Sequence, residues 1–69
     1  MNIVVNGDPR QVEQGLSVSA LLAKLGVMLD YLVVEHNSII ISRDAFDSTT
    51  LNADDRVEII SFIGGGYGD

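Results

Sequence analysis

The sequence predicts a small α+β domain in which one main helix covers one face of a mixed sheet of four or five strands. Both ends of the chain carry strand patterns, because apolar residues alternate with period two in residues 2–6 and again in residues 57–63. Between them, apolar residues in the segment 18–25 recur at helical spacing. Two further apolar runs follow this segment, so the expected order is strand, strand, helix, strand, strand, strand.

The first two strands are expected to form a hairpin. The pair Asn6-Gly7 follows the first strand and favours a tight turn, because both residues tolerate positive φ. Asp8 precedes Pro9, and a residue before proline is pushed toward extended geometry. The second strand is then expected at residues 10–13, where the short polar sequence suits the edge of a sheet.

The helix has a start signal, an end signal and one apolar face. Ser17 is suited to cap the N-terminus, and Gly26 stands where a glycine commonly ends a helix. A single apolar stripe needs a sheet to cover. We therefore expect the core to contain the residues of this stripe, Val18, Leu21, Leu22 and Leu25.

Three more strands are expected after the helix. Residues 32–35 and 39–41 are β-rich runs separated by the turn-like pair Asn37-Ser38, and residues 57–63 form the last strand. The first and last strands can pair in parallel at the centre of the sheet, because everything between them serves as the crossover. This is the β-grasp roll of ubiquitin-like folds, expected here as a single domain over residues 1–63.

The segment between the fourth and last strands is polar and irregular. Residues 44–47 are expected to form a single helical turn that points Ala45 or Phe46 inward, and Leu51 is expected to anchor residues 48–55. His36 could shuttle protons, but a solvated position beside the neighbouring turn is the favoured interpretation.

Composition excludes several classes of function. The chain has no cysteine and one histidine, which excludes disulfides, thiolate nucleophiles and the usual zinc sites. Ten acidic residues against four basic ones give a formal net charge of −6, which disfavours nucleic acids and anionic membranes. The acidity suits either solubility alone or encounter with a basic protein partner. No apolar stretch approaches ~20 residues and no secretory signal is visible, so we expect a cytoplasmic protein.

The glycine-rich end is the candidate functional segment. Gly64, Gly65 and Gly66 have no side chains to pack. We expect residues 64–69 to form a flexible tail whose bare backbone can enter a narrow active site. A tail of no consequence is the alternative interpretation for glycines alone.

One face of the sheet has no helix to cover it. If Val57 and Ile59 meet the helix, Ile60 and Phe62 must lie on the open face beside the tail. Exposed large apolar groups commonly mark interaction sites, so Ile60, Phe62 and Ile63 are the predicted docking residues. The alternative is that neighbouring strands or the long loop cover them.

The chain resembles the ThiS family, the sulfur carrier proteins of thiamine biosynthesis. The resemblance covers residues 1–66 and depends on several short segments that occur in the family's order. These are Val4-Val5-Asn6-Gly7, Ser17-Val18, Leu21-Leu22, Val34-Glu35-His36-Asn37, Ile40-Ile41-Ser42-Arg43, Asp54-Asp55-Arg56-Val57-Glu58-Ile59 and Phe62-Ile63-Gly64-Gly65-Gly66.

The resemblance implies a protein carrier and not an enzyme. In such a system a ThiF-like adenylyltransferase uses ATP to convert the terminal glycine carboxylate into an acyl-adenylate. A persulfide sulfur then replaces AMP, and a ThiG-like thiazole synthase takes the sulfur from the resulting thiocarboxylate. Gly66 would carry the sulfur, and Gly64 and Gly65 would form the slender approach to it. The carrier itself would bind no cofactor and no metal.

The chain departs from the family after Gly66, because Tyr67-Gly68-Asp69 follows where mature members end. A peptidase is expected to remove these three residues, unless they are an artificial addition. Two other functions stay open. One is the related sulfur carrier for molybdopterin synthesis, and the other is a ubiquitin-like binding module that is never activated.

Overall fold

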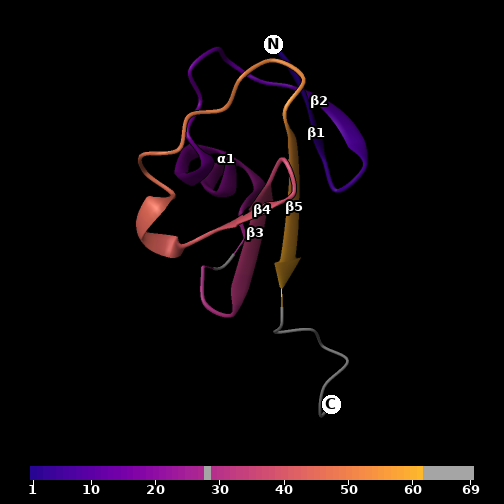
Figure 1. The fold of residues 1–69 in the computed structure, drawn as a ribbon. Helices are drawn as coiled ribbons and strands as arrows, with labels where there is room; N and C mark the ends of the chain where they lie inside the picture. Colours follow the sequence, from indigo (N-terminus) through magenta and orange to yellow (C-terminus); the bar gives the residue numbers. More distant parts are fainter. Residues whose placement is uncertain (28, 62–69) are drawn as a thin grey trace.

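Five strands form one mixed sheet in the computed structural model, which describes residues 1–27 and 29–61 (Figure 1). The elements are β1 (Asn2–Val5), β2 (Asp8–Gln11), α1 (Val18–Leu25), β3 (Leu32–His36), β4 (Ile39–Ile41), η1 (Arg43–Ala45) and β5 (Arg56–Ser61). The expected succession of strands and helix is confirmed, with one short 3-10 turn, η1, before the last strand. The strand order across the sheet is β2-β1-β5-β3-β4.

Strand β5 lies at the centre of the sheet. It pairs in parallel with β1, with Val4 opposite Arg56 and Val5 opposite Val57. On its other side it pairs antiparallel with β3, over a register that runs from Leu32 opposite Ser61 to His36 opposite Val57. The parallel pairing of the first and last strands is confirmed, and with it the β-grasp arrangement.

The second strand begins two residues earlier than residues 10–13, where the sequence placed it. Asn6 and Gly7 both have positive φ, 49° and 85°, and form a two-residue turn. In a two-residue turn, the residues on either side of the turn pair directly with each other, so Asp8 lies opposite Val5 and β2 begins there. Pro9 is tolerated because β2 is an outer strand, where its missing N–H interrupts no second ladder.

The helix begins and ends as its capping residues predict. The Ser17 hydroxyl accepts a hydrogen bond of 3.0 Å from the Ala20 amide, and Gly26 adopts a left-handed conformation with φ 71°. Leu25 is only partly buried, whereas the other residues of the apolar stripe lie in the core. Among residues 1–27 and 29–61, the buried core consists of Ile3, Val5, Leu16, Val18, Leu21, Leu22, Val34, Phe46, Leu51 and Val57.

The irregular segment between β4 and β5 is tied to the start of the helix. The amide of Val18 donates to the carbonyl of Thr49 at 2.9 Å, and the amide of Leu51 donates to the carbonyl of Leu16 at 2.8 Å. The short turn η1 begins one residue before the expected range 44–47, and Phe46 rather than Ala45 is the buried residue. No helix in the described ranges is long and apolar enough to span a membrane.

Candidate functional site: the open sheet face and the base of the last strand

The structure describes one of the predicted site residues, Ile60 in β5. Phe62, Ile63 and the glycines Gly64, Gly65 and Gly66 lie outside the described residues, as do the boundary between residues 63 and 64 and the tail 64–69. The predictions for these positions stay predictions. The site is therefore built from the part of β5 that precedes them and from the strands on either side.

Alternate side chains of β5 point to opposite faces of the sheet, as the period of a strand requires. Val57 is fully buried and Ile59 packs against the core, so both lie on the helix side. Ile60 is 42% exposed and lies on the open face, together with the exposed Glu58. The expectation that Ile60 faces away from the helix is confirmed.

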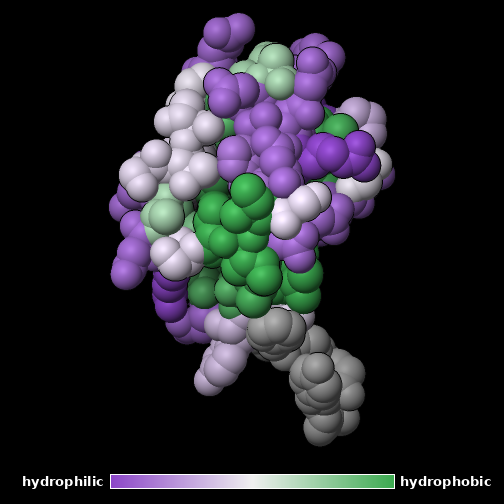
Figure 2. Space-filling model, viewed as in Figure 1, coloured by the Kyte–Doolittle hydropathy of each residue, from purple (hydrophilic) through white to green (hydrophobic). Residues whose placement is uncertain are grey.

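Hydrophobic side chains gather on the open face over β4 and the end of β5, as Figure 2 shows. Pairing places Val33 of β3 opposite Ile60, so these two residues share this face. Ile40 of β4 lies opposite Glu35 on the same face and is 66% exposed. We call the set Val33, Glu35, Ile40, Glu58 and Ile60 the open-face patch.

Two carboxylates lie side by side within the open-face patch. Glu35 of β3 is directly opposite Glu58 of β5. The ion pairs of the described residues are Lys24 with Glu13, His36 with Asp55 and Arg43 with Asp30, so neither glutamate has a cationic partner there. Like charges directly opposite one another across two strands destabilise a sheet.

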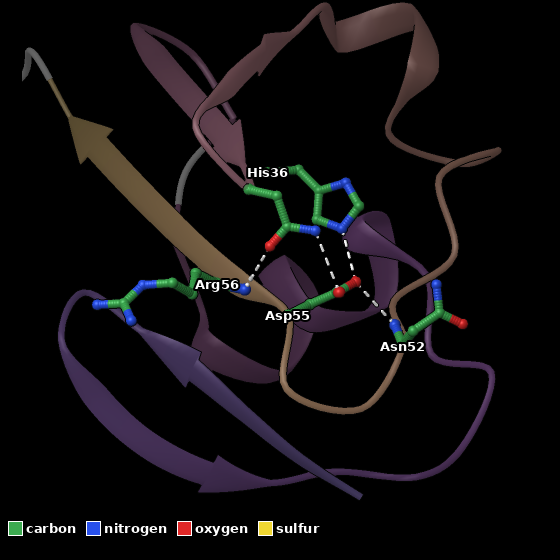
Figure 3. A network of polar contacts seen from close by, with 5 residues as sticks. His36, Asn52, Asp55 and Arg56 are labelled. Atoms are coloured by element: carbon green, nitrogen blue, oxygen red, sulfur yellow. Dashed lines mark hydrogen bonds and ion pairs between the residues drawn. The ribbon is translucent and has the colours of Figure 1, made fainter.

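The base of β5 is held by a polar network around Asp55 (Figure 3). One carboxylate oxygen, Oδ2, lies 2.7 Å from Nε2 of His36 and accepts a 2.8 Å hydrogen bond from the Asn52 amide. The other, Oδ1, accepts a 3.1 Å bond from Nδ2 of Asn37. Oδ1 of Asn37 in turn accepts from the Arg56 amide at 2.8 Å. The network joins the β3–β4 turn to the first residue of β5.

The network also sets the charge state of Asp55. Burial by itself would raise the pKa of this carboxyl, because it penalises the charged form. The hydrogen bonds from His36, from the Asn52 amide and from Asn37 outweigh burial and hold the pKa below its ordinary value. Asp55 is therefore an ionised structural residue.

His36 is not the solvated residue that the sequence suggested. Its side chain is 20% exposed and contacts Asp55, whose side chain is 11% exposed. The two residues are 19 positions apart, and only the antiparallel pairing of β3 with β5 brings them together. The pair joins the end of β3 to the base of β5, and no group of three or more His, Asp or Glu side chains in the described residues could hold a metal.

Asn6 holds β5 from the opposite side, closer to its end. Its Oδ1 accepts a hydrogen bond of 2.7 Å from the Ile59 amide, and its Nδ2 donates to the Ile59 carbonyl at 3.3 Å. The Asn6 side chain thus makes hydrogen bonds to β5 just after the end of β1, where the backbone enters the turn. The sequence indicated that Asn6 forms a turn, but no local pattern indicated that its side chain binds the backbone of Ile59.

The chain is similar to proteins of known family and structure. The model of the ThiS family matches residues 3–66. The crystal structure of a thiamine biosynthesis protein (ThiS) from Geobacter metallireducens is 43% identical and superimposes with a TM-score of 0.82, covering 96% of this chain and all of that one. A solution structure of a thiamine biosynthesis protein from the same organism is 42% identical, with a TM-score of 0.79, and covers 100% of this chain and 92% of that one.

Two curated relatives are much longer proteins. They are the thiazole synthases of Magnetococcus marinus and Paramagnetospirillum magneticum, each 38% identical over 66 residues. The match covers 96% of this chain but 20% of each synthase, so the chain spans about a fifth of their length. An uncharacterised protein, ycf40 of Porphyra purpurea, is 36% identical over 96% of this chain and 93% of its own length.

Proposed function

Because this chain belongs to the ThiS family, we propose that it is a sulfur carrier in the formation of the thiazole of thiamine. Gly66 is the residue that carries sulfur in this proposal, and Gly64 and Gly65 lead to it. The observation that carries the proposal is the family match, which runs along the whole domain and ends at Gly66. The solved relatives named for thiamine biosynthesis support the pathway.

The chemistry proceeds at the Gly66 carboxyl in steps that partner enzymes catalyse. A carboxylate oxygen attacks the α-phosphorus of ATP on a ThiF-like adenylyltransferase, and pyrophosphate leaves. The terminal sulfur of a protein persulfide then attacks the glycyl carbonyl carbon, and AMP leaves, which gives an acyl disulfide. A thiol attacks the donor's sulfur in that bond, forms a disulfide with the donor, and releases the glycyl thiocarboxylate.

The chain's own contribution is presentation. Strand β5, which leads toward the glycines, is paired on both sides and is held by the Asp55 network at its base and by Asn6 at Ile59. Gly66 is the fifth residue after Ser61, so it can lie at most roughly 18 Å from the end of the described strand. The partner's reaction centre must therefore lie within this reach of the docked domain.

Thiazole synthase is the proposed acceptor of the sulfur. Two proteins named thiazole synthase contain a segment similar to this chain within a single polypeptide. Joining a donor to its acceptor raises the effective concentration of one at the other, which is useful when the two must meet repeatedly. The fused relatives support a direct encounter between this domain and a synthase, with Ile60, Phe62 and Ile63 as proposed docking residues.

Removal of Tyr67-Gly68-Asp69 is part of the proposal. The activation chemistry needs a free glycyl carboxylate, and in the full sequence that of Gly66 is in a peptide bond. We propose that a peptidase exposes it. Intact mass of protein purified from its native host tests this step, and an active carrier that retains Asp69 would contradict it.

The test of the carrier function is a reconstitution. The chain ending at Gly66 is incubated with the cognate adenylyltransferase, ATP, a persulfide donor and a thiol, and its mass is measured. We expect pyrophosphate release and the mass increase of one oxygen-to-sulfur exchange. A chain ending at Gly64 is the matched control and should gain no sulfur. No pyrophosphate release from the Gly66 form would point instead to a binding module that is never activated.

A second measurement separates thiamine from molybdopterin synthesis. Co-purification of the native protein with thiazole synthase supports the proposal. Co-purification with the large subunit of molybdopterin synthase would assign the sulfur to the other pathway.

A further inference from the structure

We propose that the open-face patch is the docking surface for thiazole synthase, and that the synthase places a basic side chain between the carboxylates of Glu35 and Glu58. This inference rests on the proposed function, which names the partner. It goes further by assigning the surface and the charge that the partner must bring.

The strand register sets the arrangement of the patch. Glu35 has Ile40 opposite it on β4 and Glu58 opposite it on β5. Val33 and Ile60 form the next pair on the same face, two residues along β3 and β5. Residues directly opposite one another have Cβ atoms about 4.5–5.5 Å apart. The two carboxylates are thus close neighbours that border apolar side chains.

Within the described residues, no basic side chain forms an ion pair with Glu35 or Glu58. Of the four basic residues, Lys24 contacts Glu13 and Arg43 contacts Asp30, each at 3.4 Å, and Arg10 lies on the outer strand β2, which does not pair with β3 or β5. Arg56 lies two positions before Glu58 in β5, and the described part of the structure contains no ion pair between them. A guanidinium or ammonium group of a partner protein, placed between the carboxylates of Glu35 and Glu58, would attract both of them and offset their mutual repulsion. Arginine fits best, because its planar fork can bind two carboxylate oxygens at once.

The exposed apolar side chains of the patch favour a protein surface over a free ion as the binding partner. Ile40 is 66% exposed and lies opposite Glu35, and Ile60 is 42% exposed and lies two residues after Glu58 in β5. A partner that covers them excludes water from the carboxylates, and the attraction between opposite charges is stronger there than in water. The chain's formal charge of −6 also favours the approach of a basic surface.

The position of the patch suits the acceptor of the sulfur. Ile60 lies one residue before the end of the described part of β5, at the side of the domain from which the glycine segment continues. A synthase docked here has Gly66 within the reach of roughly 18 Å that five residues allow. Docking and sulfur transfer can therefore occur in one complex.

The experiment measures the affinity of the full chain for thiazole synthase from the same organism by calorimetry, at low and at physiological salt. The double variant Glu35→Gln/Glu58→Gln should bind at least about tenfold more weakly at low salt, and its affinity should depend less on salt. Asp44→Asn/Asp47→Asn is the matched control, because it removes the same charge from exposed positions around η1 and should bind within about twofold of the parent. Ile40→Ala tests the apolar part and should also weaken binding.

The outcomes separate this inference from the proposed function. Equal binding by the glutamate variant and the parent would overturn the inference, and so would an equal loss in the control. If the parent binds the adenylyltransferase and not the synthase, the docking assignment is wrong while the carrier function stands. If the chain ending at Gly66 never gains sulfur, the proposed function itself is wrong. Unfolding midpoints of all variants, measured in parallel, show that each change acts on a folded domain.

Discussion

Single side chains decide how the central strand is held. Asp55 receives hydrogen bonds from three directions at the base of β5, and Asn6 binds both backbone groups of Ile59 further along it. All buried side-chain nitrogen and oxygen atoms in the described residues have hydrogen-bond partners. A buried charge is costly unless it is satisfied in this way. The polar residues around β5 therefore hold the strand that precedes the glycine segment in the sequence.

Replacing Asp55 should change how stability depends on pH. The folded-state pKa of Asp55 is below its ordinary value of 3.8, so the ionised form stabilises the fold at higher pH. This stabilisation is complete above the ordinary pKa and is lost as pH falls below about 4, through the folded-state pKa. We expect Asp55→Asn to lower the free energy of unfolding by about 1–3 kcal/mol at pH 7 and by less at pH 3. Urea unfolding at both pH values measures the difference.

Asp54→Asn is the matched control for this prediction, because Asp54 is the exposed neighbour. Equal losses in Asp55→Asn at pH 7 and pH 3 would show that the network does not depend on the charge. Asp54 has a φ of 70°, which asparagine also tolerates, so the control introduces no backbone strain.

Leu22 is the residue that most directly tests the helix–sheet core. It is 1% exposed and belongs to the buried cluster. Leu22→Ala should lower the free energy of unfolding by about 2–5 kcal/mol, because it removes apolar contacts and leaves a cavity. Lys24→Ala on the exposed side of the same helix should change it by about 0.5 kcal/mol or less. An unchanged denaturation midpoint for Leu22→Ala would contradict the assigned face of the helix.

At the scale of elements, the two edges of the sheet differ in character. Strand β2 carries charged residues and a proline, which discourage pairing with another chain. Strand β4 consists of three isoleucines, of which Ile39 and Ile40 are about two-thirds exposed. The apolar edge and the open-face patch lie on the same half of the sheet. The half formed by β3, β4 and β5 is therefore the one suited to a protein partner.

The opposed glutamates of β3 and β5 should lower the stability of the free protein. Removing one of them relieves a repulsion between directly opposite residues. We expect Glu35→Gln to raise the free energy of unfolding by about 0.2–1 kcal/mol, measured by urea unfolding at low salt. Asp47→Asn removes the same charge from an exposed loop position and should have a smaller effect. A fall in the free energy of unfolding of Glu35→Gln would contradict the expected repulsion, and would mean that Glu35 makes a net stabilising contact.

For the whole molecule, the question is whether the glycine segment contributes to the fold. Among the described residues, the ten residues of the buried core all lie between Ile3 and Val57, well before the glycine segment in the sequence. The chemistry of the proposed carrier begins only beyond them. Folding and sulfur transfer should therefore respond to different parts of the chain.

Deleting Gly65 and Gly66 tests this separation. We expect an unchanged thermal midpoint and complete loss of sulfur transfer, because the ten described core residues are all retained while the proposed reacting carboxyl is lost. Calorimetry and the reconstitution assay measure the two effects. A marked fall in the midpoint would mean that the segment is structural. Retained transfer would place the reactive carboxyl elsewhere.

Local chemistry in the sequence was sufficient to predict the order of the strands and the helix, but not every boundary, since β2 begins two residues before its predicted position. Ser17 and Gly26 bound the helix, Asn6-Gly7 forms the first turn, and Asn37-Ser38 forms the second with φ of 51° and 73°. These features depend on residues that are neighbours in the chain, so propensity and capping rules describe them. The family resemblance, and with it the proposed role of Gly66, was also readable from the sequence.

Only the tertiary structure decided the contacts between distant segments. His36 meets Asp55 across 19 positions and Asn6 meets Ile59 across 53, and the pairing of Glu35 with Glu58 requires a specific register of β3 against β5. No local pattern encodes these contacts, because a shift of one residue in either strand would turn each side chain to the other face. Packing of the helix against one face selects the register. The same selection leaves the glutamates and isoleucines together on the face that remains open.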